Sequence, residues 1–345
     1  MKLGILGGGI GARVNINLKA IKHAEALGYD SVWTAEAWGG DAVTPAAWIL
    51  AQTDTIKVGT AIMQMPARTP AMTAMTAMSL AELSGGRFIV GLGASGPQVI
   101  EGWHGVPYGK PVTRLKEYVQ VMQQIFARKA PAAFDGELYQ LPYTGPGATG
   151  LGKPLKSILH CEEDIPIYAA NITPRGVAAA AEVCDGFFPI WMDPEKYSVF
   201  EKPIQQGFDA AGDKNLTQFE VSPFVTVIMG DDVAKCMMPI RANMALYIGG
   251  MGARGKNFYN NYATALGFED EAVKIQDLFL SGKKDEAAAA VPAELIDACH
   301  LVGPAQRIKE RLGRWKTAGN KGHVGAMLLG CQQPEALELI AAEML

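Results

Sequence analysis

Residues 56–93 read IKVGTAIMQMPARTPAMTAMTAMSLAELSGGRFIVGLG, and the order of elements in this stretch indicates the fold class. A strand-like apolar run, Ile56–Ile62, is followed by a helical stretch, Pro70–Leu83, and by a second strand-like run, Arg87–Leu92. The same order recurs on both sides of this segment. Regular alternation of strand and helix predicts a parallel sheet covered by helices, which is an α/β fold.

The alternation continues along the whole chain. The expected strands are Leu3–Leu6, Ser31–Glu36, Ile56–Ile62, Arg87–Leu92, Ile165–Ala170, Gly186–Ile190, Glu220–Met229 and Val324–Leu329. Each is followed by a helix, and eight such units close into a barrel. We therefore predict a single (β/α)8 TIM barrel over residues 1–345, with insertions at about 130–163 and 247–304.

Composition argues against several classes of protein. Hydrophobic residues make up 49% of the chain and charged residues 19%, which fits a globular protein with a large buried sheet. We identify no signal peptide and no apolar run near the roughly 18 residues of a membrane span. A net charge of −4 without a stripe of Lys and Arg disfavours nucleic acid as a partner. Five separated cysteines without a CxxC pair indicate free thiols, a cytoplasmic location and no metal site.

Two glycine motifs suggest a rival fold. Gly7–Ala12 follows the first strand and matches GxGxxA, the pyrophosphate-binding pattern of Rossmann dehydrogenases. Glu36 is available as the ribose-binding acid, but it lies 27 residues after Gly9, whereas the usual spacing is ~20. Gly91–Gly96 matches GxGxxG, yet the long helix begins only after Pro111. Both loops also suit a barrel, because small residues at strand ends leave room for a flat ring across its mouth.

A set of short segments carries a family resemblance: Thr34–Trp38, Val58–Ile62, Arg68–Ala71, Leu80–Arg87, Val90–Gly93, Asp164–Ala170, Ala181–Gly186 and Val302–Pro304. Together they resemble the bacterial luciferase-like superfamily, in the branch that uses the deazaflavin coenzyme F-420. The layout is most similar to those of methylenetetrahydromethanopterin reductase and F-420-dependent glucose-6-phosphate dehydrogenase. The resemblance spans most of the chain and is specific in combination.

The resemblance implies a cofactor site at the mouth of the barrel. In this family the third strand ends in a bulge whose non-proline cis peptide supports the deazaflavin ring, and the matching bond is Ala61–Ile62, followed by Met63. Gly93, Ala94 and Ser95 would contact the ribityl or phosphate portion, although a tight turn also explains their small size.

The cofactor phosphate would lie after the fifth strand. The matching residues are Ala170, Asn171, Ile172 and Thr173, at the start of a helix whose N–H groups face an anion. A plain helix cap by Thr173 is the alternative interpretation of this segment.

The chain also departs from the family pattern. Ala37 stands where the sugar-phosphate branch has a histidine that takes part in proton transfer, and Leu6 stands where the methanopterin reductase pattern has Glu. No acid follows the fourth-strand glycines until Glu101. The substrate chemistry of these relatives therefore cannot simply be carried over.

Two residues are candidates for the proton transfer that accompanies hydride transfer. Glu36 ends the second strand, where catalytic side chains of barrels gather, and contact with the cofactor is an equally good role for it. His104 is the one histidine expected near the mouth, and loop packing is its alternative role. Trp38, Trp103 and Trp191 are candidates for the wall of a substrate pocket.

We expect an oxidoreductase that moves a hydride between F-420 and a small organic substrate. The alternatives are an FMN-dependent monooxygenase of the same fold, a barrel that binds cofactor without catalysis, and a Rossmann dehydrogenase that uses NAD(P). Family resemblance also implies a homodimer formed by outer helices near the first four βα units. On one of these helices, Met72, Met75 and Met78 recur at threes and are expected to pack on the barrel.

Overall fold

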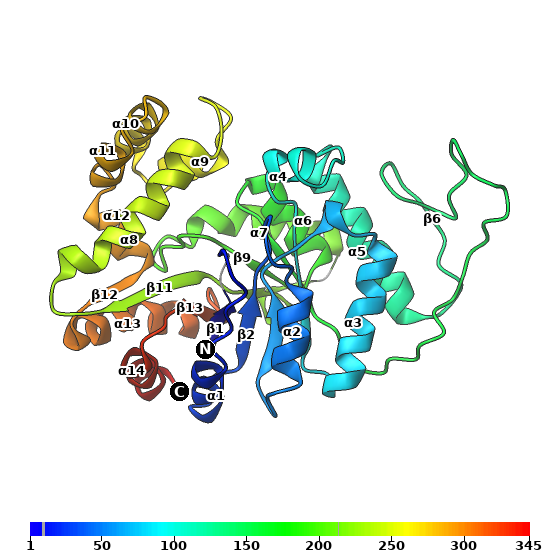
Figure 1. The fold of residues 1–345 in the computed structure, drawn as a ribbon, viewed down its shortest axis with the longest axis horizontal. Coiled ribbons are helices and arrows are strands. Elements are labelled where there is room, and N and C mark those ends of the chain that lie inside the picture. Colours follow the sequence, from blue (N-terminus) through cyan, green and yellow to red (C-terminus); the bar gives the residue numbers. More distant parts are fainter. Residues whose placement is uncertain (9–10, 213) are drawn as a thin grey trace.

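A ring of parallel strands lies at the centre of the molecule, and helices surround it (Figure 1). The computed structural model describes residues 1–8, 11–212 and 214–345. In this described part of the chain the barrel strands are β1 (Lys2–Gly8), β2 (Ser31–Thr34), β3 (Lys57–Thr60), β5 (Phe88–Gly93), β8 (Ile167–Ala170), β9 (Gly186–Phe188), the consecutive segments β10 (Glu220–Val221) and β11 (Phe224–Met229), and β13 (Ala326–Gly330).

The sheet closes on itself through residues 220–229. β10 pairs with β9 on one side, and β11 pairs with β13 on the other. Two more hydrogen bonds complete the seam: the Ser222 N–H donates to the Phe187 carbonyl (3.0 Å), and the Leu328 N–H donates to the Pro223 carbonyl (2.9 Å). β13 in turn pairs with β1. The predicted (β/α)8 barrel is therefore confirmed, with β10 and β11 together as its seventh strand.

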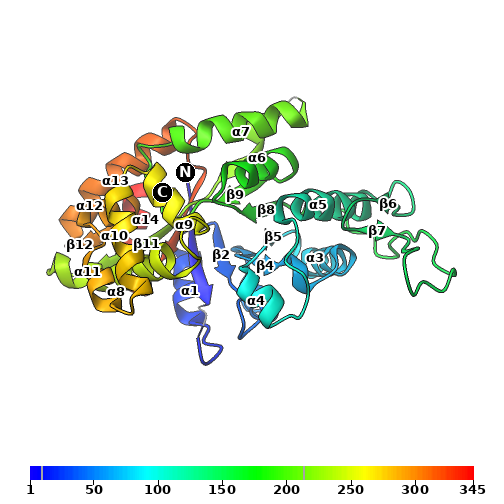
Figure 2. The same ribbon diagram turned by 90° about the horizontal axis from the view of Figure 1, so that it is seen from above.

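Helices cover the outside of the barrel (Figure 2). The outer helices are α1 (Leu18–Ala26), α2 (Val43–Leu50), α3 (Pro70–Ser84), α5 (Pro111–Ala127), α6 (Pro174–Val183), α7 (Ser198–Ala211), α13 (Ala305–Asn320) and α14 (Pro334–Met344). Shorter helical turns are η1 (Met65–Ala67), α4 (Pro97–Gly102) and η2 (Leu216–Gln218). Thr69 caps α3 and Thr173 caps α6, each ahead of a proline at the first helical position, so these starts follow directly from the sequence.

The Rossmann hypothesis is wrong, because the sheet is a closed barrel and not an open one. The first glycine motif lies partly outside the described residues, at Gly9 and Ile10, and α1 begins only at Leu18, capped by Asn17. The second motif leads into α4, which is six residues long, and the long helix begins at Pro111. Neither motif feeds directly into a long helix, as a dinucleotide site requires.

Two segments extend from the barrel at opposite ends of the molecule in both views (Figures 1 and 2). One segment, called the helical insertion below, contains α8 (Val233–Ala245), η3 (Leu246–Gly250), α9 (Phe258–Ala265), α10 (Glu269–Leu280), α11 (Lys284–Ala289) and α12 (Ala293–Cys299). It ends in β12 (Leu301–Gly303), which pairs with β11. The sequence did not predict this strand, because three residues show no periodicity.

The other segment, residues 130–163, is called the arm below. Its regular structure is a small antiparallel hairpin of β6 (Phe134–Asp135) and β7 (Gln140–Leu141). The buried carboxylate of Glu117 on α5 holds the turn, because it accepts hydrogen bonds from the N–H groups of residues 137, 138 and 139 at 2.7, 2.9 and 3.0 Å. The arm is thus tied to the barrel at its base.

The interior of the barrel is filled by one cluster of buried side chains. Its members are Trp33, Ile89, Tyr168, Phe188, Ala326 and Leu328. The Trp33 ring meets the Phe188 ring edge-on, with centroids 5.0 Å apart, and a Cβ at Gly59 would overlap it. The barrel is therefore a packed core, and its open face is the mouth where the strands end.

The expected methionine face of α3 is only partly correct. Met78 is fully buried, but Met72 and Met75 are 54% and 57% exposed. The buried face of α3 is instead made mainly of small residues, including Ala74, Ala77 and Ala81. A spacing of three drifts around a helix of 3.6 residues per turn, so three such residues do not share one face.

Candidate functional site

An apolar platform crosses the mouth of the barrel. It consists of Leu6 from β1, Ala61 and Ile62 from the loop after β3, and Ala170 at the end of β8, all packed against the cluster that fills the barrel. These four residues are half-buried, so part of each remains accessible from the mouth. An apolar surface at the C-terminal ends of barrel strands is suited to the face of a flat ring.

A bulge after β3 brings two platform residues into place. Gly59 pairs with Ile89 and Met63 of β4 (Met63–Gln64) pairs with Leu92, so four steps on one strand match three on the other. The Thr60 hydroxyl bridges the gap, because it bonds both the N–H and the carbonyl of Gly91 at 2.9 Å. The bulge and the cis peptide Ala61–Ile62 that the resemblance implies are both present.

The residues after β5 form the next edge of the platform. A Cβ at Gly93 would lie 2.7 Å from Cγ1 of Ile62, so glycine allows the platform residue to pack there. Ala94 and Ser95 follow and are half-buried. The side chain of Met63, by contrast, is 1% exposed and belongs to the core outside the barrel. At Met63 the backbone, and not this buried side chain, is therefore the part that can face the mouth.

The start of α6 lies beside Ala170. Thr173 Oγ1 accepts the Gly176 N–H at 3.2 Å, which is the cap considered as the alternative interpretation. Asn171 and Ile172 are half-buried in the turn before it. The side chain of Arg175 is exposed at the first turn of this helix. This arginine was missed, although a basic residue next to a helix N-terminus strengthens an anion site.

Glu36 joins several elements and does not present a free oxygen. Its Oε1 accepts from Nη1 of Arg68 (2.6 Å) and from the Gln64 N–H (2.7 Å), and its Oε2 accepts from the Ala42 N–H (3.0 Å). The side chain is 6% exposed. These contacts connect the end of β2 to α2, β4 and the loop before α3. This geometry favours a positioning role for Glu36, because both of its oxygens accept hydrogen bonds from neighbouring elements.

His104 is fixed by a neighbour that sequence reasoning missed. The Gln64 amide nitrogen donates to the Ala37 carbonyl at 2.8 Å, so its Oε1 is left to accept from Nε2 of His104 at 2.7 Å. This network assigns the ring proton to Nε2. Gln64 is the hydrogen-bond partner of this ring among the described residues, so Nδ1 has no protein partner there. Gln64 follows the bulge directly, which is the signal that could have singled it out.

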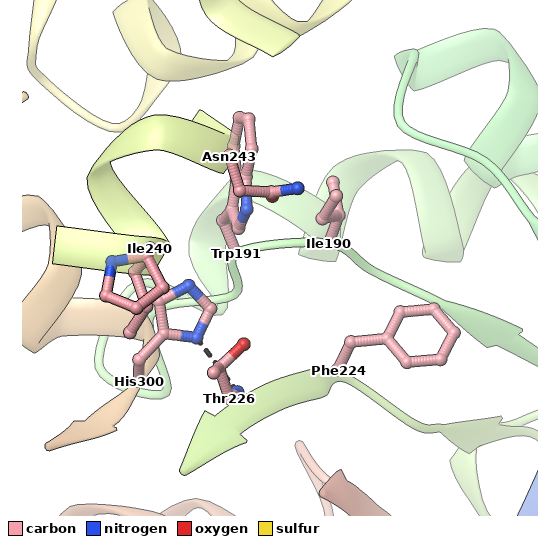
Figure 3. A pocket seen from close by; sticks show the side chains of 8 residues that line it. Ile190, Trp191, Phe224, Thr226, Ile240, Asn243 and His300 are labelled. Atoms are coloured by element: carbon pink, nitrogen blue, oxygen red, sulfur yellow. Dashed lines mark hydrogen bonds between the residues drawn. The ribbon is translucent and has the colours of Figure 1, made fainter. Parts of the chain in front are cut away.

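A cavity of about 240 Å³ opens where β9 and β11 meet the helical insertion (Figure 3). Of the three tryptophans expected near the mouth, Trp191 lines this cavity, whereas Trp38 and Trp103 are 59% and 65% exposed. The residues that line the cavity are Ile190, Trp191, Phe224, Thr226, Pro239, Ile240, Asn243 and His300.

Residues 1–8, 11–212 and 214–345 lack two kinds of feature. No helix there is long and apolar enough to cross a membrane. No group of three or more His, Cys, Asp or Glu residues there is arranged to hold a metal ion. The five cysteines are free.

Comparison with known proteins adds an independent line of evidence. A Mycobacterium tuberculosis protein, provisionally named a coenzyme F-420-dependent oxidoreductase, is 42% identical over 322 residues, which cover 92% of this chain and 93% of that protein. Two solved structures share the fold. One is the coenzyme F-420-dependent tetrahydromethanopterin reductase from Methanopyrus kandleri (TM-score 0.76, 20% identity, covering 99% of this chain and 97% of that one). The other is an F-420-dependent secondary alcohol dehydrogenase in complex with an F-420–acetone adduct (TM-score 0.72, 18% identity, 99% and 98% covered).

The family assignment rests on most of the length of the chain. Residues 6–321 match the family described as luciferase-like monooxygenase, and this range runs from the end of β1 to just past α13. It includes the platform, the bulge and the start of α6. The chain therefore belongs to the luciferase-like monooxygenase family.

Proposed function

We propose that this protein is an oxidoreductase that binds coenzyme F-420 at the mouth of its barrel and uses it on a small organic substrate. The observation that carries the proposal is the half-buried apolar platform of Leu6, Ala61, Ile62 and Ala170, bordered by a small-residue loop and by a helix N-terminus. When bound, the deazaflavin supplies or accepts a hydride. The 42% identical relative supports the choice of cofactor.

Each part of the cofactor has a matching part of the chain. The platform supports one face of the flat ring. Ala94 and Ser95 are small enough to let the ribityl chain pass along the mouth. The start of α6, at Asn171, Ile172 and Thr173, receives the phosphate, because backbone N–H groups and the exposed Arg175 both favour an anion. These three parts of the chain follow one another along the mouth in the order in which the ring, the ribityl chain and the phosphate are linked, which supports the proposal.

His104 is the residue that we propose to exchange the proton. Its Nε2 donates to Gln64, so Nδ1 is the atom that accepts a proton from the substrate or returns it. Glu36 acts on the same network as a positioning residue, because it holds the Gln64 backbone and Arg68. Gln64 follows Ile62 and Met63 in the chain, so its bond to His104 connects this ring to the segment that carries the platform.

We also propose a homodimer formed through the outer faces of α2 and α3. Trp48 on α2 and Met72, Met75 and Leu83 on α3 are all more than half exposed. Apolar side chains gathered on neighbouring helices are typical of a surface that another chain covers.

The cofactor proposal is tested by titrating the purified protein with F-420, FMN and NADPH and measuring fluorescence quenching. We expect micromolar binding of F-420 and none of NADPH. Binding of FMN in place of F-420 would favour the monooxygenase alternative, and binding of NADPH alone would contradict both. Turnover of F-420 with any substrate would exclude a barrel that only stores the cofactor.

The placement of the phosphate has its own control. Ile172→Glu adds a negative charge beside α6, whereas Ile172→Gln has nearly the same shape without the charge. Like charges at close range cost several kcal/mol, so we expect Ile172→Glu to weaken F-420 binding by at least about tenfold. Ile172→Gln should bind nearly as the wild type does. The phosphate-free 8-hydroxy-5-deazariboflavin should bind both variants alike, and equal losses for both ligands would place the phosphate elsewhere.

A further inference from the structure

The cavity at the edge of the helical insertion is apolar except for a few polar groups. Of its eight lining residues, none carries a carboxylate, an ammonium or a guanidinium group. Ile190, Trp191 and Phe224 come from the barrel side, and Pro239 and Ile240 come from α8 (Figure 3). Its volume of about 240 Å³ is below the roughly 300–1,000 Å³ of pockets for drug-sized ligands, so it has room for about one ring.

His300 is the imidazole among the polar residues of this cavity, which also include Thr226 and Asn243. It lies between α12 and β12, is 4% exposed and lines the cavity. Its Nδ1 accepts the backbone N–H of Thr226 at 3.1 Å, and the dashed line in Figure 3 marks this bond. A nitrogen that accepts carries no proton, so the ring proton of the neutral imidazole is on Nε2.

Nε2 lacks a partner within the protein as described. Thr226 is the hydrogen-bond partner of the His300 ring among the described residues, and Nε2 lies on the other side of the ring, toward the remaining lining residues (Figure 3). Burial also lowers the pKa of His300 to about 4, so the ring is neutral at physiological pH. Nε2 is not one of the fully buried polar atoms that lack a partner, so this donor is accessible from the cavity and can bond a ligand that carries an acceptor.

The cavity adjoins the platform. Phe224 lines the cavity and also packs against the cluster that fills the barrel, together with Leu6, Ala61, Ile62 and Ala170. Its ring lies 5.5 Å from the Phe188 ring, centroid to centroid. A ligand group in the cavity therefore lies across one aromatic side chain from the place proposed for the deazaflavin.

We propose that this cavity binds the uncharged end of the substrate, an apolar ring or short branched chain bearing one carbonyl oxygen, and that Nε2–H of His300 donates to that oxygen. The identification of the ligand as the substrate rests on the function proposed above. The selectivity of the cavity for an uncharged carbonyl compound is independent of that function. The absence of charged lining residues disfavours carboxylates and phosphates, because a buried ion needs a partner. His300 is thus a specificity-determining residue for ketones, aldehydes or enones.

The experiment compares two probes of nearly the same shape on the full chain without cofactor. Cyclohexanone has the acceptor oxygen, and methylenecyclohexane has a CH2 group in its place. Dissociation constants come from ligand-observed NMR titrations of the wild type, His300→Leu and His300→Gln. Both variants lose the bond to Thr226, but glutamine keeps a donor near the position of Nε2, so the pair separates the donor from the structural contact.

We expect the wild type to bind cyclohexanone about tenfold more tightly than methylenecyclohexane, which is the effect of one net hydrogen bond. His300→Leu should lose or reverse this preference, because the ketone is more strongly hydrated in water, and His300→Gln should retain part of it. Equal binding of the two probes to the wild type, or an unchanged preference in His300→Leu, would overturn the proposal.

A second measurement needs no variant. In the wild type with 15N-labelled histidine, the Nε2–H proton of His300 should move downfield with cyclohexanone and stay in place with methylenecyclohexane. The same protein is titrated with F-420. Ketone preference without F-420 binding would reject the proposed function and keep the cavity, whereas F-420 binding without ketone preference would do the opposite.

Discussion

The arm and the helical insertion both extend from the barrel, but they differ in the burial of their apolar side chains. In the helical insertion, Ile248, Ile275 and Ile296 are fully buried. In the arm, Leu151 is 85% exposed, Leu155 70% and Ile158 94%. The two segments also lie at opposite ends of the molecule (Figure 2).

This difference shows which of the two segments is packed by residues of its own chain. The helical insertion packs its apolar residues into the main core, so it is part of the fold and can shape a cavity beside the barrel. The arm depends on polar contacts at its base and leaves its apolar residues in solvent. Apolar side chains that one chain does not bury are available to another chain.

The largest expected effect is in the buried segment. Replacing Ile275 by Ala removes three side-chain carbon atoms from a site with no exposure, and such changes lower the free energy of unfolding by about 2–5 kcal/mol. The matched change in the arm, Ile158→Ala, should alter it by less than about 0.5 kcal/mol. Urea denaturation at low protein concentration measures both. Similar losses of unfolding free energy in the two variants would mean that the two segments do not differ in packing.

The next effect depends on pH and concerns the contact between the insertion and the barrel. Because burial lowers the pKa of His300 to about 4, the unfolded chain takes up a proton on this ring near pH 6.5 while the folded chain stays neutral. Its stabilising contribution is complete above about pH 6.5 and is lost as the pH falls through about 4. The loss reaches roughly 3 kcal/mol.

Other groups titrate in the same range, so the measurement is a difference. The free energy of unfolding is measured from pH 7 to pH 4 for the wild type and for His300→Gln. The wild type should lose more stability than the variant on acidification. Parallel curves would mean that His300 is accessible to protons in the folded protein.

The barrel could be predicted from the sequence, because its strands are apolar runs followed by strong helix starts such as Thr69–Pro70 and Thr173–Pro174. The sequence was also sufficient for the bulge at Ala61–Ile62, through family resemblance. It was not sufficient for β12, whose three residues become a strand only because β11 offers a free edge. Pairing between segments far apart in the chain leaves no periodic signal in a run that short.

The same limit applies to the candidate site. Ala170, Ala94 and Ser95 could be placed at the mouth from their positions after strands. The partners of Glu36 could not, because Arg68 and Ala42 reach it only in the folded barrel. The place of His300 at a cavity could not be predicted either, because only packing turns this side chain toward it. Side-chain direction within irregular segments is set by tertiary contacts.

A smaller effect is expected at the base of the arm. Glu117→Gln replaces an ionised acceptor of three N–H groups, and hydrogen bonds to charged groups contribute about 1.5–3 kcal/mol. Hydrogen exchange should become faster at the amides of residues 137–139 and stay unchanged in β2 and β3. The control is Glu137→Gln, which breaks only an exposed ion pair with Lys110 worth about 0–1 kcal/mol. Equal exchange rates at these amides in both variants would mean that the turn is stable without the Glu117 carboxylate.

The smallest effect tests whether the second copy that we propose to cover α2 and α3 also covers the arm. Ile158→Ser should leave the folding of one chain nearly unchanged but raise the dimer dissociation constant several-fold, because it removes apolar area from the contact. Val273→Ser is the matched control, since Val273 is 54% exposed on α10 at the opposite end of the molecule. Analytical ultracentrifugation over a range of concentrations measures both constants. If Val273→Ser weakens the dimer and Ile158→Ser does not, the chains meet through the helical insertion, and the exposed residues of the arm have another role. If Ile158→Ser alone weakens it, the arm completes its packing on the second copy, as the helical insertion does on its own barrel.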